Sequence, residues 1–268
     1  MLCFFTVCSV GMGVGLLIWQ HWYDSFGGVC LAMASAAGCF VLLHLLFALV
    51  ICVSCLLVDL NRPVKRRSRY FSFLFQRFIP LAFFWAKIRV HVSGLEKLDG
   101  QRNFMLVCNH LSIFDPVILA GVLPRHNVSF ISKKENYHIP VVRKIMHKIA
   151  CLPLDREDNR QALRTILQAA QFLKEQDLCM AVFPEGKTSP DGTLQPFRNG
   201  AFKVAQRAQR PIVVACLSNT KQIGQNMFRR RTDVQVKILQ VIPLAVVNES
   251  STVQLGALAH QAMEQSGV

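Results

Sequence analysis

The feature that most restricts how this chain folds is its uncharged beginning. The first sixty residues contain two acids, Asp24 and Asp59, and no lysine or arginine. Two apolar stretches, residues 2–20 and 29–58, fill most of this region. A helix of about 20 apolar residues crosses the ~30 Å hydrocarbon core of a bilayer, and a longer one tilts or extends into the interface. The sequence therefore predicts a membrane-anchoring helical hairpin over residues 1–61.

Basic residues begin directly after the second apolar stretch. Five of them lie in eight positions: Arg62, Lys65, Arg66, Arg67 and Arg69. Basic clusters beside a membrane span mark its cytoplasmic side, so both ends of the hairpin are expected to face the cytosol. The formal net charge of +14 is carried entirely by the chain after the hairpin, which indicates anionic lipids or substrates as partners. A cleaved signal peptide is disfavoured because no basic segment precedes the first apolar stretch.

Residues 62–91 are predicted to form a basic juxtamembrane segment that contains an interfacial helix. Within residues 70–86, Phe71, Leu74 and Phe78 recur at helical spacing. A third span is the alternative, but it would place Arg77 near the bilayer centre at a cost of at least ~2.5 kcal/mol. A helix lying in the headgroup layer is therefore favoured.

Short β-type runs alternate with helical periodicity through the rest of the chain, residues 92–268. Helical spacing is clearest over 159–175, and residues 251–263 suit a closing helix. The runs are 88–92, 103–108, 127–132, 150–154, 178–183, 211–217 and 233–242. This alternation predicts an α/β domain with a mostly parallel sheet flanked by helices.

The segment from Asn109 to Pro116 carries the parts of a general base and its orienting partner. His110 follows a buried apolar run, and Asp115 stands five residues later. An imidazole accepts a hydroxyl proton near neutral pH, and a carboxylate on its other nitrogen fixes the tautomer. The structural alternative is that Asp115 caps a helix whose first residue is Pro116.

Three further polar clusters follow predicted strands, over residues 131–135, 154–156 and 183–189. Open parallel sheets bind ligands beyond the carboxyl ends of their strands. The basic side chains in these clusters suit an anionic substrate that carries a hydroxyl: Lys133, Arg156 and Lys187. The alternative for the same side chains is a solvated basic edge with surface ion pairs. A nucleotide-binding loop is excluded, because position 181 is alanine where that loop needs glycine.

These blocks, in this order, resemble those of the 1-acyl-glycerol-3-phosphate acyltransferases over about residues 92–247. The matching segments are Asn109-His110 to Asp115-Pro116, Ser132 to Glu135, Phe183 to Gly186, Phe197 to Ala201 and Pro211 to Val213. The resemblance implies transfer of an acyl group from acyl-CoA or acyl carrier protein to the sn-2 hydroxyl of lysophosphatidic acid. The product is phosphatidic acid, for phospholipid biosynthesis.

The resemblance also implies residue roles, with no metal and no cofactor. His110 takes the hydroxyl proton, Asp115 orients the ring, and Glu185 and Gly186 shape the acceptor site. The remaining basic residues bind the glycerol phosphate: Lys133, Arg156, Lys187 and Arg198.

Two departures from the family pattern leave the acceptor open. Lys187-Thr188 stands where the family has Thr-Arg, and Val214 replaces a proline of the last block. The alternatives are an acyltransferase for another lyso-lipid, such as lyso-ornithine lipid, and a non-catalytic membrane-tethered module that binds anionic lipid. Nucleic acid is disfavoured because aromatic residues for base stacking are scarce in the basic half of the chain. Short loops without eukaryotic sorting signals favour a bacterial plasma membrane, and the oligomeric state is left open.

Overall fold

The computed structural model describes residues 1–155 and 157–267, which divide into two compact units, Met1–Asp59 and the chain from Leu60 onward. The first unit is a pair of packed helices, α1 (Leu2–Trp19) and α2 (Phe26–Leu56), joined by the short 3₁₀ helix η1 (Trp22–Asp24). Both α-helices are long and apolar enough to cross a membrane. The predicted pair of N-terminal apolar helices is therefore confirmed, and it is consistent with membrane association.

Small residues allow α1 and α2 to approach closely. A Cβ on Gly13 would lie 2.9 Å from the Cβ of Ala36, a distance that only a missing side chain permits. Gly and Ala at such crossings let two apolar helices gain packing contacts in a bilayer, where the hydrophobic effect gives them none. Ser25 begins α2 by accepting a hydrogen bond from the Gly28 backbone at 3.0 Å.

The second unit is built on a seven-stranded sheet in the order β1-β7-β6-β2-β5-β3-β4. The strands are β1 (Ile88–Ser93), β2 (Met105–Cys108), β3 (Ser129–Lys133), β4 (Leu152–Leu154), β5 (Met180–Val182), β6 (Ile212–Ser218) and β7 (Thr232–Ile242). Among the strand pairs of the described residues, β6–β7 alone is antiparallel. The predicted α/β class with a mostly parallel sheet is confirmed.

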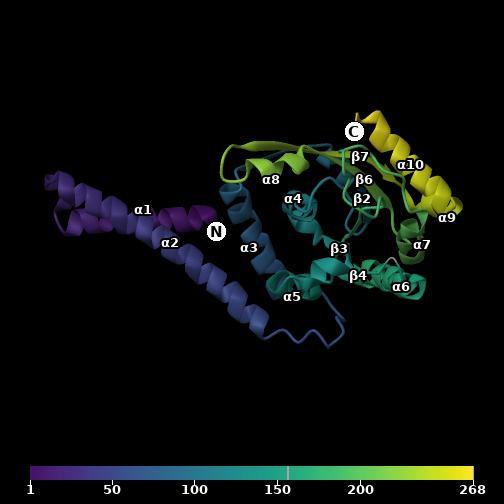
Figure 1. Cartoon of the computed structure of the whole chain (residues 1–268), viewed down its shortest axis with the longest axis horizontal. Helices are drawn as coiled ribbons and strands as arrows, with labels where there is room; N and C mark the ends of the chain where they lie inside the picture. Colours follow the sequence, from purple (N-terminus) through teal and green to yellow (C-terminus); the bar gives the residue numbers. More distant parts are fainter. Residues whose placement is uncertain (156, 268) are drawn as a thin grey trace. The chain divides into compact units, whose positions relative to one another are not determined.

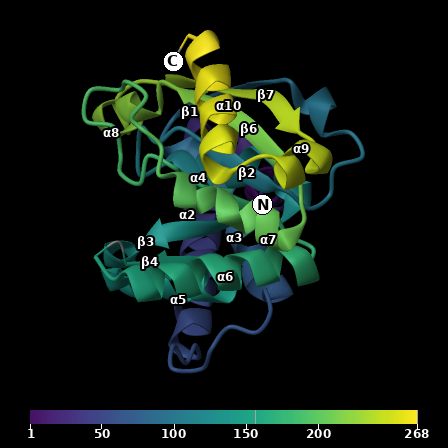
Figure 2. The ribbon, with the colours of Figure 1, turned by 90° about the vertical axis from the view of Figure 1, so that its right-hand side faces the viewer.

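Helices cover both faces of this sheet (Figures 1 and 2). One face carries α3 (Arg69–Trp85), α4 (Asp115–Val122) and α5 (Pro140–Lys148), and the other carries α6 (Asn159–Glu175), α7 (Lys203–Ala208) and α10 (Thr252–Gln265). The shorter helices are α8 (Ile223–Asn226), α9 (Leu244–Glu249), η2 (Leu95–Leu98), η3 (Pro124–His126), η4 (Lys134–His138), η5 (Asn199–Phe202) and η6 (Thr220–Gln222).

The hydrophobic core on the α6 side is continuous. Strand residues such as Met105 and Val214 pack with Leu173 of α6 and Leu255 of α10, all without solvent exposure. Alternate residues of each strand face the α4 side, where Ile118 is equally buried. The sheet is therefore a rigid platform, and its loops can hold functional groups in fixed positions.

The predicted interfacial helix is α3, and it belongs to the second unit. It buries Ile79 against Gly121 of α4, while Tyr70, Phe73 and Phe84 are about half exposed. Residues 62–91, which the sequence predicts as a separate juxtamembrane segment, lie within the same compact unit. The contact of the exposed aromatic face of α3 with a bilayer stays a prediction.

The carboxyl ends of β2, β3, β5 and β6 lie along one edge of the sheet, which we call the carboxyl-terminal edge. β7 runs antiparallel to β6, and β1 is parallel to β7. The starts of β1 and β7 therefore lie at this same edge.

Candidate active site

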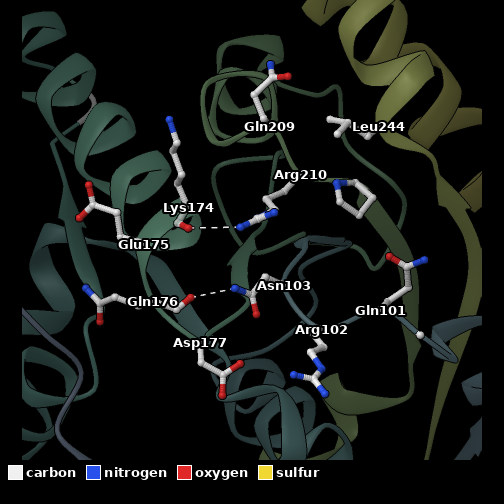
Figure 3. A pocket seen from close by; sticks show the side chains of 12 residues that line it. Gln101, Arg102, Asn103, Lys174, Glu175, Gln176, Asp177, Gln209, Arg210 and Leu244 are labelled. Atoms are coloured by element: carbon white, nitrogen blue, oxygen red, sulfur yellow. Dashed lines mark hydrogen bonds between the residues drawn. The ribbon is translucent and has the colours of Figure 1, made fainter.

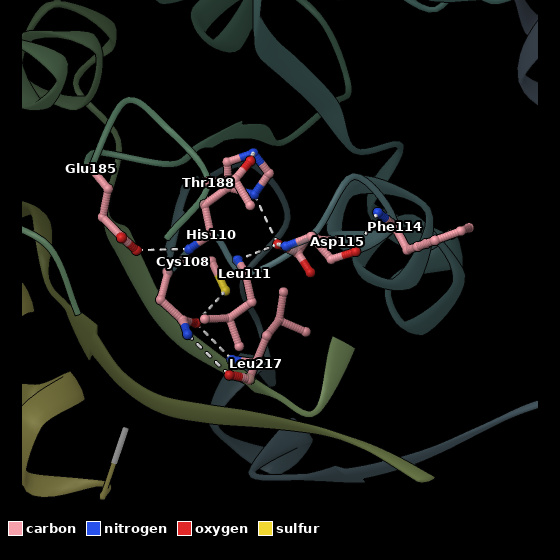
Figure 4. Close-up of polar contacts among 10 residues, drawn as sticks. Cys108, His110, Leu111, Phe114, Asp115, Glu185, Thr188 and Leu217 are labelled. Carbon is pink, nitrogen blue, oxygen red and sulfur yellow. Dashed lines mark hydrogen bonds and ion pairs between the residues drawn. The ribbon is translucent and has the colours of Figure 1, made fainter. Parts of the chain in front are cut away.

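The loop between β2 and α4 brings His110 and Asp115 together at the carboxyl-terminal edge. His110 Nδ1 lies 2.8 Å from Asp115 Oδ2 (Figure 4). The aspartate side chain has no solvent exposure, whereas the histidine side chain is 19% exposed. A carboxylate only accepts hydrogen bonds, so its partner Nδ1 is assigned the proton, and Nε2 keeps a free lone pair. The pair has the geometry of a base and its orienting carboxylate.

Asp115 directs its carboxylate back into the loop. The same Oδ2 accepts the backbone N–H groups of Leu111 at 2.7 Å and Ser112 at 2.8 Å. Helix α4 begins at Asp115 with Phe114 as its N-cap, and no side-chain cap bond is formed. The alternative that Asp115 is a helix cap is therefore wrong, because its charge satisfies loop N–H groups and the imidazole.

Glu185, predicted from the family resemblance to shape the acceptor site, points at the backbone. Its Oε1 accepts the His110 backbone N–H at 2.7 Å, and its Oε2 accepts the Gln195 N–H at 3.3 Å. The side chain is buried, and burial raises the pKa of Glu185, opposed by these hydrogen bonds. The carboxylate thus links the His110 loop to the loop after β5.

Asn109 extends the β2–β6 pairing beyond the end of β2. Its Nδ2 donates to the Leu217 carbonyl at 3.0 Å, and its Oδ1 accepts the Leu217 N–H at 2.8 Å. The side chain is completely buried. Sequence reasoning matched Asn109 to a motif without giving it a role, because its partner lies more than a hundred residues away.

Two side chains define the surroundings of Nε2. The Phe183 ring stacks on the imidazole, with centroids 4.3 Å apart at 20°. Thr188 Oγ1 lies 3.4 Å from Nε2, and the next residue, Ser189, donates its backbone N–H to the His110 carbonyl at 2.7 Å. The Thr188 hydroxyl therefore lies where a substrate hydroxyl would have to approach Nε2. From the sequence, Thr188 was noted only within the Lys187-Thr188 departure from the family pattern, and no role was predicted for it.

Comparison with known proteins finds a family model that matches the part of the chain containing this site. The model of the Acyltransferase family matches residues 89–218. Residues 89–218, just under half of the chain, are therefore similar to the acyltransferase family.

Relatives and a solved structure extend the likeness. The chain is 32% identical over 158 residues to the 1-acyl-sn-glycerol-3-phosphate acyltransferase alpha of Homo sapiens, covering 58% of this chain and 56% of the relative. It is 26% identical to the 1-acyl-sn-glycerol-3-phosphate acyltransferase of Salmonella typhimurium, covering 82% of this chain and 86% of the relative. The crystal structure of the acyltransferase PlsC from Thermotoga maritima has a TM-score of 0.63 at 23% identity, covering 82% and 87% of the two chains.

The solved structure supports the fold assignment. The chain spans 59%, 55% and 64% of the length of three curated relatives, from Caenorhabditis elegans, Ovis aries and Homo sapiens.

Beside Phe183, the second unit has a groove of about 340 Å³ between the loop after β5 and α6. Its walls include the apolar side chains of Ile131, Leu154, Leu163, Ile166 and Val182. Two predicted site residues, Gly186 and Arg198, also line it. Gly186 has a φ of 80°, a conformation that favours glycine, and it closes a turn onto the Phe183 carbonyl at 3.0 Å.

The predicted phosphate-binding lysines lie on the surface of the same edge. Lys133, at the end of β3, is 49% exposed and pairs with Glu135 at 3.0 Å. Lys187 is exposed, in the loop between Gly186 and Thr188. Arg156, the remaining predicted cation, lies outside the described residues.

A larger pocket of about 580 Å³ lies at the opposite edge, where β2 and β6 begin (Figure 3). Arg210 donates there to the Lys174 carbonyl at 3.2 Å, and Asn103 donates to the Gln176 carbonyl at 2.9 Å. Acidic and basic side chains both line this pocket. None of the predicted site residues that the structure describes lines it.

Proposed function

We propose that the protein transfers a fatty acyl group from an acyl thioester to the sn-2 hydroxyl of 1-acyl-glycerol-3-phosphate, giving phosphatidic acid. The observation that carries this proposal is the 2.8 Å contact of His110 with the buried Asp115, with Nε2 on the exposed side. The names of the human and bacterial relatives support the same reaction. The reaction as written uses no metal or cofactor.

In this scheme, His110 Nε2 accepts the proton of the acceptor hydroxyl while that oxygen attacks the thioester carbonyl. The carbon–sulfur bond then breaks, and the departing thiolate receives the proton from the imidazolium. Asp115 stabilises the imidazolium between these two steps. General base assistance of this kind contributes roughly 10²–10⁴-fold, or about 3–5 kcal/mol of the barrier. CoA and acyl carrier protein both satisfy the scheme as the thiol carrier.

The acceptor phosphate is proposed to bind the cations of the carboxyl-terminal edge. Arg198 lines the groove beside Phe183, and Lys133 reaches the edge from β3. Lys187 adds a third charge next to Thr188, which stands where the family usually has arginine. Because lysine is a point charge without the bidentate fork of arginine, it tolerates a wider range of anionic head groups.

The catalytic unit is proposed to face the cytoplasm. Its basic residues 62–69 directly follow the second apolar helix, as expected for the cytoplasmic side of a span. The relatives come from animals, a plant and a bacterium, so the bacterial plasma membrane stays a prediction from sequence.

The decisive experiment assays the purified full-length protein in lipid nanodiscs with a panel of lyso-lipids and both thioester donors. We expect acylation of lysophosphatidic acid, and a loss of at least about 100-fold in kcat for His110→Ala with an unchanged melting temperature. His91→Ala is a matched control, because His91 forms a similar 2.9 Å contact with Asp233 but is 55% exposed.

Each result of this assay has a defined meaning. An active His110→Ala variant would contradict the mechanism. Acylation of lyso-ornithine lipid alone would preserve the chemistry and change the acceptor. No transfer with any acceptor would favour a non-catalytic lipid-binding module.

A further inference from the structure

An aromatic residue followed by three arginines forms the loop between α8 and β7. Phe228 is 67% exposed, and its φ of 66° lies in the left-handed region that large side chains rarely adopt. Arg229, Arg230 and Arg231 follow it, all exposed. The fold thus keeps a large apolar ring in solvent among positive charges. The scheme for acyl transfer uses none of these residues.

This loop is joined to the end of α3. Lys87 Nζ donates to the Arg229 carbonyl at 3.3 Å, and the Thr232 N–H donates to the Lys87 carbonyl at 3.0 Å. Phe84 and Trp85, the last two residues of α3, are each 48% exposed, and their ring centroids lie 5.3 Å apart. We call the combined surface the edge cluster; it consists of Phe84, Trp85, Lys87, Phe228 and Arg229 to Arg231.

The edge cluster lies on the same edge of the sheet as His110. Thr232 starts β7, and Ile88, which follows Lys87, starts β1 and pairs with Thr232. Since β7 is antiparallel to β6, and β6 is parallel to β2, these starts adjoin the ends of β6 and β2. Figure 1 shows the loop after α8 beside the end of α3. Ile113, 78% exposed, adds an apolar side chain to the His110 loop itself.

We propose that the edge cluster docks on an anionic bilayer surface. Aromatic rings favour the headgroup layer, and arginine and lysine bind lipid phosphates by charge and hydrogen bonds. The exposed aromatic rings of the edge cluster suit the headgroup layer, and its four cations suit the negative charge of the lipid phosphates. Asp233 contacts Arg231 at 3.6 Å and also contacts His91 at 2.9 Å. One carboxylate offsets only one of the four positive charges, so the edge cluster keeps a net positive charge.

Docking in this orientation turns the mouth of the His110 site toward the membrane. A lyso-lipid then reaches Nε2 without leaving the bilayer. This consequence rests on the proposed function, whereas docking itself does not, and the two are measured separately.

The first test places an environment-sensitive fluorescent amino acid at position 228 of the full-length protein in nanodiscs, without substrate. Position 253 on α10 is the matched control, because Val253 is 60% exposed on a helix of the opposite face. We expect blue-shifted emission and quenching by brominated lipid at position 228 when phosphatidylglycerol is present. Position 253 is expected to stay accessible to iodide.

Equal iodide access at the two positions in every lipid mixture would overturn the proposal. A spectral response at position 228 to added RNA but not to anionic lipid would overturn it as well, in favour of a nucleic acid. Neither readout depends on catalytic activity, so failure of docking is distinct from failure of the proposed reaction.

The second test removes charge with Arg229→Gln and Arg231→Gln together. Arg230 is kept, because its Nε donates to Asn226 Oδ1 at 2.6 Å and supports the loop. We expect the docked-to-free ratio reported from position 228 to fall roughly fivefold for each charge removed, at low salt. Acylation of a long-chain lyso-lipid in the bilayer should fall, while acylation of a short-chain soluble analogue stays unchanged.

The control for this pair is Arg102→Gln with Lys174→Gln, which removes the same charge at the opposite edge, beside the pocket of Figure 3. An equal loss of docking in both double variants would show a general charge effect and overturn the specific surface.

Discussion

One buried carboxylate, that of Glu185, holds the two loops of the site together and gives stability a defined pH dependence. Burial raises the pKa of Glu185 in the folded chain, so the folded state binds this proton more tightly than the unfolded state does. The contribution of this group to stability therefore decreases as pH rises from the ordinary glutamate pKa of about 4.3 through the raised folded value.

We expect Glu185→Gln to remove this pH-dependent loss. The difference in unfolding free energy between variant and wild type should shift in favour of the variant as pH rises through that window, as measured by chemical unfolding in detergent. The variant should also lower kcat by roughly 10–100-fold, because the His110 backbone loses its charged acceptor and the ring is less precisely held. Glu249→Gln, at an exposed position, is the control and should change neither slope nor kcat.

Residue roles were only partly predictable from the sequence. The spacing of His110 and Asp115 was sufficient to place them together, because only four residues separate them. The partners of Asn109 and Glu185 were not predictable, because each contact joins loops that follow different strands. For Glu185, the family resemblance indicated a substrate contact, whereas its oxygens bond backbone N–H groups.

At the level of elements, the packing of α3 on α4 depends on a missing side chain. A Cβ on Gly121 would lie 2.8 Å from Ile79 Cγ2 and 3.0 Å from Phe83 Cζ. Gly121→Ala gains about 1 kcal/mol of helix propensity but forces these side chains apart, at a typical cost of 1–3 kcal/mol. We expect a net destabilisation of up to about 2 kcal/mol in thermal unfolding.

Gly224→Ala is the matched control for this prediction. Gly224 also lies in a helix, and a Cβ there would meet nothing within 4 Å. Its substitution should be neutral or stabilise by up to about 1 kcal/mol. Equal stabilisation by both substitutions would show that α3 does not pack tightly against Gly121.

Elements with a long or regular pattern were predictable. Each of the seven β-type runs predicted along the chain overlaps a strand, and the helix predicted over 159–175 has those limits. The alternative in which Asp115 caps a helix starting at Pro116 places the start of α4 one residue late, because α4 begins at Asp115 itself. Short elements such as α7 and α8 were not predicted, since one or two turns carry too little periodicity to identify them.

For the whole molecule, the dominant property is the separation of an uncharged beginning from a basic remainder. In the proposed reaction, attraction of the basic unit for an anionic acyl-CoA donor acts through exposed charges, which salt screens beyond about 8 Å at physiological ionic strength. We therefore expect kcat/KM for acyl-CoA to fall several-fold between low salt and 0.5 M NaCl, with kcat nearly constant. Sucrose at matched osmolarity is the control, and an unchanged kcat/KM would contradict a role for this charge.

By itself, the sequence determined the apolar hairpin, the α/β class and the edge at which the polar clusters gather. These properties follow from local patterns: length of apolar runs, residue periodicity, and the rule that parallel strands end together. The order of the strands in the sheet decided which loops meet at the site. His110 meets Glu185 across 75 residues of sequence, and Asn109 meets Leu217 across 108, through hydrogen bonds that no local pattern encodes. The antiparallel pairing of β7 with β6 also places Phe228 and the arginines after it at the carboxyl-terminal edge, where His110 lies. Only the assembled sheet defines which loops are neighbours.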